Sequence, residues 1–64
     1  MENGVWIARD KEGILAIFDN KPILGIDNAW YCEYPDEEFS IINSEMFPEI
    51  TFENSPKQLI IKEN

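Results

Sequence analysis

The chain contains no histidine, one cysteine and only five lysine and arginine residues among its 64 amino acids. The absence of histidine excludes acid–base catalysis by an imidazole, and together with the single cysteine it excludes a zinc site. The single cysteine, Cys32, excludes an internal disulfide bond. Because thirteen acidic residues outweigh the five basic ones, the net charge is −8, which argues against direct binding to a nucleic-acid phosphate backbone.

Long apolar runs are also missing from the sequence. No run approaches the roughly 20 residues that a membrane-spanning helix needs, and no export signal precedes the first strand-like segment. One free thiol without an export signal is typical of a protein of the reducing cytoplasm. We therefore expect a cytoplasmic protein that does not bind a membrane.

The sequence offers no set of residues for catalysis. Cys32 would need a base and positive neighbours to act as a nucleophile, but the nearby Glu33, Asp36 and Glu37 would raise its pKa instead. We expect Cys32 to be a small buried hydrophobic residue. The sequence therefore predicts a protein that is not an enzyme and that has no catalytic, cofactor or metal site.

A β-hairpin is predicted at the start of a single domain, residues 1–64. Residues 5–9 are rich in β-branched and aromatic side chains, and residues 14–18 are apolar throughout. Between them, Gly13 supplies the positive φ that closes a type I turn with a bulge. The unbroken apolar run at 14–18 indicates burial of both faces, or one face covered by a partner chain. The second alternative predicts self-association, and we expect a homodimer.

Turns every eight to ten residues divide the rest of the chain. Further strands are expected at residues 22–24, 30–34, 39–42 and 58–62, with 39–42 pairing back on 30–34. Residues 50–52 are expected to form a short strand or an extended segment. Ser55 and Pro56 also fit the start of a helix, but the few residues left and the β-branched Ile60 and Ile61 favour a strand. The predicted fold is a small all-β antiparallel meander or half-barrel of five to six strands, with one short helical turn near residues 44–47.

Two segments carry a resemblance to known sequences. They are WIARDK at residues 6–11 and FPEITFENSP at residues 47–56. They resemble a group of short uncharacterised proteins of gut bacteria and of their phages and mobile elements. The group has no assigned activity, so no functional residue can be transferred. The resemblance implies a cytoplasmic accessory protein of a bacterium or phage.

The acidic residues are the most prominent polar feature. The net charge is −2 over residues 1–30 and −6 over residues 31–64. Asp36, Glu37 and Glu38 lack the ligand spacing of a calcium loop. A solvated turn is the simplest interpretation of this run, and mimicry of nucleic-acid phosphates is an alternative. The predicted partner-binding residues, which would attract a basic protein, are Asp36, Glu37, Glu38, Glu49 and Glu53.

These observations predict a non-enzymatic protein that acts through a protein partner, as an adaptor or an inhibitor of phage or mobile-element origin. The alternative is a structural component of a homo-oligomer or phage assembly, and an acidic DNA mimic is a more distant one. Three basic residues near the first two turns, Arg9, Lys11 and Lys21, could contact an acidic partner. Charges that flank strands and prevent edge pairing are the simpler interpretation of these residues.

Overall fold

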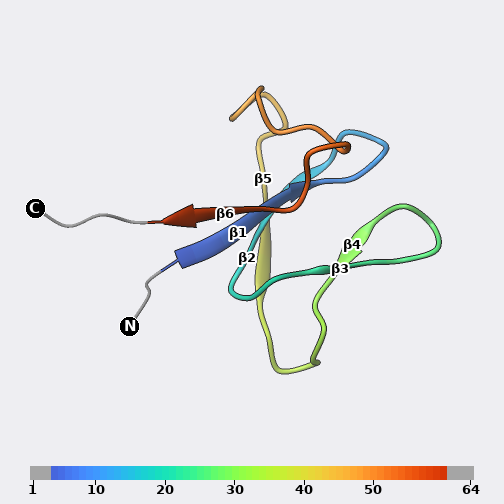
Figure 1. Cartoon of the computed structure of the whole chain (residues 1–64), viewed down its shortest axis with the longest axis vertical. Coiled ribbons are helices and arrows are strands. Elements are labelled where there is room, and N and C mark those ends of the chain that lie inside the picture. The colour runs from blue at the N-terminus through green and yellow to red at the C-terminus, as the bar shows by residue number, and fades with distance from the viewer. Residues whose placement is uncertain (1–3, 61–64) are drawn as a thin grey trace, which may run out of the picture.

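The computed structural model describes residues 4–60 and forms two antiparallel sheets (Figure 1). The strands are β1 (Gly4–Arg9), β2 (Leu15–Phe18), β3 (Ile23–Leu24), β4 (Trp30–Tyr31), β5 (Phe39–Ile42) and β6 (Lys57–Ile60). Four of them form the main sheet in the order β5-β2-β1-β6, and β3 pairs with β4. Residues 4–60 include no helix. The all-β prediction with five to six strands is confirmed, and the sheet is open rather than closed into a barrel.

Several details of the predicted strands are wrong. The segment 39–42 pairs with β2 rather than with residues 30–34, because Phe39 lies opposite Phe18 and their rings stack with centroids 5.5 Å apart. The strand expected at 30–34 is limited to Trp30–Tyr31. The tail is a strand at Lys57–Ile60, and residues 61 and 62 lie outside the described part of the chain.

No strand forms at residues 50–52, because their polar neighbours use the backbone in turns. The N–H of Thr51 donates to the Asn54 side chain at 2.8 Å, and the N–H of Asn54 donates to the Thr51 hydroxyl at 3.2 Å. The helical turn expected near 44–47 is a single turn, closed by a 3.0 Å hydrogen bond from Met46 N–H to the Asn43 carbonyl. It is too short to count as a helix.

Both hairpins close with the same turn geometry. In the first, Asp10 N–H donates to the Ile14 carbonyl at 2.9 Å, and Gly13, at φ 101°, donates back to the Asp10 carbonyl at 3.1 Å. This is the predicted type I turn with a bulge. In the second, Gly25 and Ala29 make the equivalent pair, and Asn28 takes the positive φ position at 64°. Asparagine tolerates this conformation better than most residues, which explains its place there.

Gly25 is required because of the position of the Tyr31 ring. A Cβ atom at residue 25 would lie 2.5 Å from a carbon of that ring. The Tyr31 hydroxyl donates a hydrogen bond to the Asp27 carboxylate. This bond lowers the pKa of Asp27 and raises the pKa of Tyr31. It therefore stabilises the β3–β4 hairpin at neutral pH and is lost as the pH falls through the lowered pKa of Asp27.

The main sheet buries apolar side chains on both of its faces, as the apolar run at 14–18 predicts. On one face, Ile7 and Leu15 are fully buried and pack with Ile50. On the other face lie Ala8, Ala16 and Phe18, with Trp6, Trp30 and Cys32 packed against them. The segment 43–56 covers the first face, and the β3–β4 hairpin covers the second. Both covers belong to this chain, so burial of β2 does not require a partner.

Arg9 holds the segment 43–56 against the sheet. Its guanidinium donates five hydrogen bonds, one for each of its N–H groups, and all five acceptors are backbone carbonyl groups. These acceptors are the carbonyls of Gly13, Ser44, Met46, Phe47 and Ile50. The backbone N–H of Arg9 also donates to the Ser55 hydroxyl at 2.9 Å. One side chain therefore joins the first hairpin to most of the segment that follows β5.

We predict that Arg9→Lys lowers the free energy of unfolding by about 2 kcal/mol. Lysine has only three N–H donors for the five carbonyl groups, and its ammonium group cannot direct them as the planar guanidinium does. Urea denaturation followed by tryptophan fluorescence measures this change. The control is Lys11→Gln, an exposed turn residue whose replacement should change stability by less than about 0.5 kcal/mol. Equal stability of the Arg9→Lys variant and the unsubstituted protein would contradict the role of Arg9.

Candidate functional site

The strongest candidate site is the outer edge of β5. Hydrogen bonding alternates along an antiparallel pair, and the N–H of Asp19 donates to the Glu38 carbonyl at 3.2 Å, one step before β5 pairs with β2. The alternation then directs the backbone groups of Ser40 and Ile42 toward β2. The N–H and carbonyl groups of Phe39 and Ile41 point away from the sheet, so the edge offers four backbone hydrogen-bonding groups.

The side chains of this edge are unusually apolar for an exposed strand. Phe39 is 54% exposed and Ile41 is 66% exposed, both on the face that carries Ala16 and Phe18. Natural proteins protect edge strands with charged residues, prolines or bulges. The opposite edge, β6, carries Lys57, whereas β5 contains no charged residue. An apolar, unprotected edge of this kind is typical of a site that accepts another strand.

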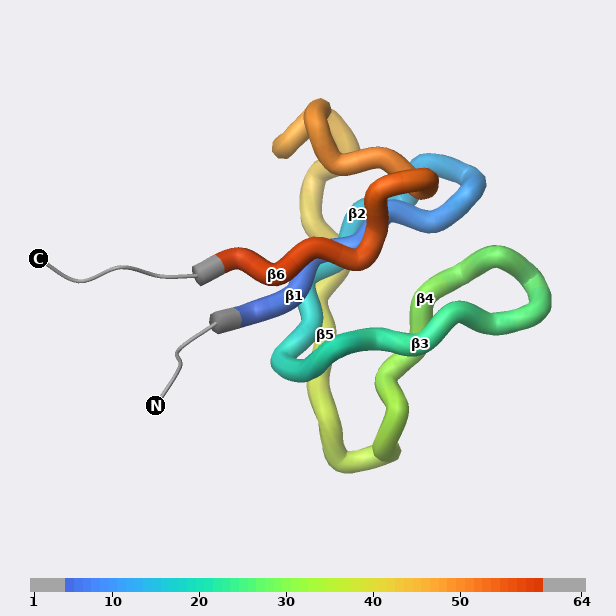
Figure 2. The backbone as a smooth tube through the Cα atoms, viewed as in Figure 1, coloured from blue at the N-terminus to red at the C-terminus, as the bar shows by residue number. Residues whose placement is uncertain are grey.

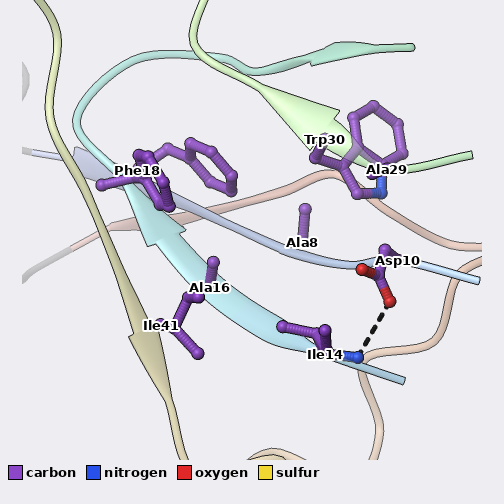
Figure 3. A pocket seen from close by; sticks show the side chains of 9 residues that line it. Ala8, Asp10, Ile14, Ala16, Phe18, Ala29, Trp30 and Ile41 are labelled. Carbon is purple, nitrogen blue, oxygen red and sulfur yellow. Dashed lines mark hydrogen bonds between the residues drawn. The ribbon is translucent and has the colours of Figure 1, made fainter. Parts of the chain in front are cut away.

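A small hollow lies beside this edge, between β2, β5 and β4 (Figure 3). Its volume is about 150 Å³, and its rim includes the exposed side chains of Ile14, Phe39 and Ile41. Its remaining lining residues are Ala8, Asp10, Ala16, Phe18, Ala29 and Trp30. Ligand pockets are usually about 300–1,000 Å³, whereas a cavity of about 150 Å³ holds one benzene-sized group. The hollow therefore suits one apolar side chain better than a substrate or cofactor.

The hollow exists because two of the residues that face it are alanines. Ala8 and Ala16 are directly opposite each other in the β1–β2 ladder, and their methyl groups do not fill the space above the sheet. Trp30 bounds the hollow on the other side and is fixed there by a 3.1 Å hydrogen bond from its indole N–H to the Arg9 carbonyl. The Trp30 ring also contacts Phe52, with centroids 6.5 Å apart.

The structure separates the five acidic residues predicted to bind a partner. Asp36, Glu37 and Glu38 precede β5 directly, and the segment that contains Glu49 and Glu53 lies beyond the other end of that strand (Figure 2). All of these side chains are exposed except Glu37, which is half-buried. The Glu37 carboxylate accepts hydrogen bonds from Glu33 and Tyr34 and shapes a turn. The run at 36–38 therefore lies at one end of β5, whereas Glu49 and Glu53 belong to the segment that packs on the sheet through Ile50 and bonds β1 through Ser55.

The basic residues proposed to contact a partner have other roles in the described part of the chain. Arg9 is occupied by the five backbone carbonyls. Lys21 places its ammonium group 5.7 Å from the centroid of the Trp6 ring, a cation–π contact. Lys11 is exposed, and its backbone N–H donates to the Asn28 carbonyl at 3.1 Å. Lys11 and Lys21 are both exposed, whereas Arg9 is half-buried.

Cys32 is half-buried against the cluster of Ala8, Ala16 and Phe18. Desolvation by this packing raises the pKa of its thiol, and the negative charges of Glu37 and Asp19 raise the pKa further. Of the three acidic residues expected to raise this pKa, Glu37 does so, while Asp19 is a neighbour that only the fold brings close. A thiol with a raised pKa is a poor nucleophile at neutral pH.

The described part of the chain, residues 4–60, contains no group of three or more acidic or cysteine side chains arranged to hold a metal ion. It also contains no helix with the length and apolar character needed to cross a membrane. Comparison of the chain with protein-family models, with curated proteins and with solved structures gives no match.

The sequence did not single out Phe39 and Ile41, which are the main exposed apolar residues of the site. Both belong to a segment that the sequence correctly assigned to a strand. The available signal was the lack of any charge in a strand that directly follows three acidic residues. That signal becomes informative only once the strand is known to lie at an edge of the sheet.

We predict that Cys32 reacts slowly with iodoacetamide at neutral pH and that its alkylation rate rises at a higher pH than that of a cysteine in an unstructured peptide. The variant Glu37→Gln should shift the rate profile to lower pH, since it removes a charge but keeps an oxygen that accepts the turn hydrogen bonds. The control Glu12→Gln removes a charge from the first turn and should leave the profile unchanged. A profile identical to that of the peptide would contradict this description of Cys32.

Proposed function

We propose that this chain is a small non-enzymatic interaction protein that binds a basic partner protein through the edge of β5, as an adaptor or an inhibitor. The observation that supports this most directly is the uncharged edge strand, which exposes Phe39, Ile41 and four backbone hydrogen-bonding groups. The acidic residues that flank the strand in the sequence, Glu38 and Glu45, would attract a positively charged partner and raise its association rate. The resemblance to short bacterial and phage proteins suggests an accessory protein of the cytoplasm.

Self-association is the second candidate, since the same uncharged edge could pair with a second copy. In that case the chain would be a structural component of a homo-oligomer or a phage assembly. The charge of −8 on each copy opposes this association. The division of the acidic residues into two groups does not favour mimicry of a nucleic-acid backbone, so we do not include it in the proposal.

The experiment uses the unsubstituted protein and two isoleucine-to-lysine variants as bait, and compares the proteins that each captures from an extract of the native host cells. Ile41→Lys places a charge on the proposed edge, whereas Ile26→Lys places the same charge on a fully exposed residue of the β3–β4 turn. We predict that the unsubstituted protein and Ile26→Lys capture the same partner in stoichiometric amount. Ile41→Lys should capture at least tenfold less of this partner.

Circular dichroism and thermal melting of both variants show whether each is folded at the temperature of the capture. Equal retention of the partner by folded Ile41→Lys and by Ile26→Lys would contradict the proposed edge. Retention of only the chain itself would favour the homo-oligomer.

A further inference from the structure

We infer that the partner supplies an extended segment that joins the main sheet as a fifth strand beside β5, with apolar residues at its centre and basic residues at both ends. This inference rests on the proposed function and specifies its binding mode. It is carried by three features of the β5 edge: outward-facing backbone groups, exposed apolar side chains with a hollow behind them, and acidic residues at both ends of the strand.

The backbone of β5 defines the length of this segment. The N–H and carbonyl groups of Phe39 and Ile41 lie two residues apart along the strand and can bond two alternate residues of an added strand. A segment of about five residues therefore covers the edge. Its side chains on the face of Phe39 and Ile41 would pack on them, and a long one would extend over Ile41 toward the hollow of about 150 Å³.

The charges around β5 define the ends of the segment. Glu38 is adjacent to the strand, and Asp19 stands opposite Glu38 in the ladder, so two like charges share one end. At the other end, the turn that follows β5 contains Glu45. A strand advances about 3.3 Å per residue, so basic residues two or three positions from the centre would lie within about 8 Å of these carboxylates, where physiological salt screens incompletely.

A second copy of the chain fits this edge less well than a basic segment. Two-fold pairing centred on Ser40 would set Phe39 opposite Ile41 of the other copy, which is a favourable apolar pair. It would also bring residues 36–38 of one copy next to residues 42–44 of the other, and therefore close to Glu45. The acidic groups of both copies would then face each other without a counter-charge, so the charges favour a basic occupant.

A synthetic peptide tests this inference with the purified chain. The probe has five central residues of alternating leucine and threonine, with three lysines at each end. One control peptide has proline in place of the three leucines, which removes the backbone donors that would face β5 but keeps the charge and an apolar side chain at each of these positions. A second control has glutamate in place of the lysines. Binding is measured by NMR chemical-shift changes at low and at high salt.

We expect the lysine peptide to shift the amide signals of Phe39 and Ile41, and the proline and glutamate peptides to bind at least tenfold more weakly. Ile41→Lys should weaken the binding of the lysine peptide by a similar factor, whereas Ile26→Lys should leave this binding unchanged. Equal binding of the lysine and proline peptides would overturn strand addition while leaving a basic partner possible. If the lysine peptide does not bind, but a cellular partner is captured and its capture requires Ile41, strand addition by a basic segment is overturned. The proposed function would still stand in that case.

Sedimentation of the free chain provides the remaining test. A monomer up to millimolar concentration agrees with a basic partner as the occupant of the edge. A dimer that forms with the unsubstituted protein and with Ile26→Lys, but not with Ile41→Lys, would show that a second copy occupies the edge and would overturn the inference.

Discussion

The fold depends on the five hydrogen bonds that the Arg9 guanidinium donates to backbone carbonyls. The segment 43–56 has no long strand of its own, and its carbonyl groups must find donors where it packs on Ile7 and Leu15. Arg9 supplies these donors from the end of β1, while its backbone carbonyl accepts the indole N–H of Trp30 on the opposite face. The covers of both faces of the sheet are thus anchored at one residue, which suits a chain too short for a large core.

The chain has only two covering segments, both anchored at Arg9, and this explains why the β5 edge is open. The two covers shield the centre of the sheet, but neither extends over the outer side of β5, and the alanines at 8 and 16 leave the adjacent hollow unfilled. A protein selected only for stability would fill this hollow with larger side chains and place a charge on the edge strand. Phe39 stacks on Phe18 and so contributes to folding, but the exposed surfaces of Phe39 and Ile41 remain available for the binding proposed above.

Local signals in the sequence predicted the local parts of this structure. Gly13 and the polar residues before it identified the first hairpin, and the strand at 39–42 followed from its composition. The pairing of β5 with β2 joins residues more than twenty positions apart, and nothing in the local pattern specifies that choice. Arg9 looked like a surface charge beside a turn, because its acceptors are carbonyl groups that any sequence would provide. The acidic residues were recognisable as a feature, but the sequence did not indicate that the fold separates residues 36–38 from Glu49 and Glu53.

Amide hydrogen exchange of residues 38–42 in the free chain tests the central claim most directly, since each amide reports its own hydrogen bond. If the edge of β5 is open, the amides of Phe39 and Ile41 exchange at nearly the rate of an unstructured peptide, while those of Ser40 and Ile42 are protected by β2. Adding the lysine peptide should protect the amides of Phe39 and Ile41 from exchange as well. Strong protection of Phe39 and Ile41 in the free monomer would show that the edge is already paired and would contradict the account.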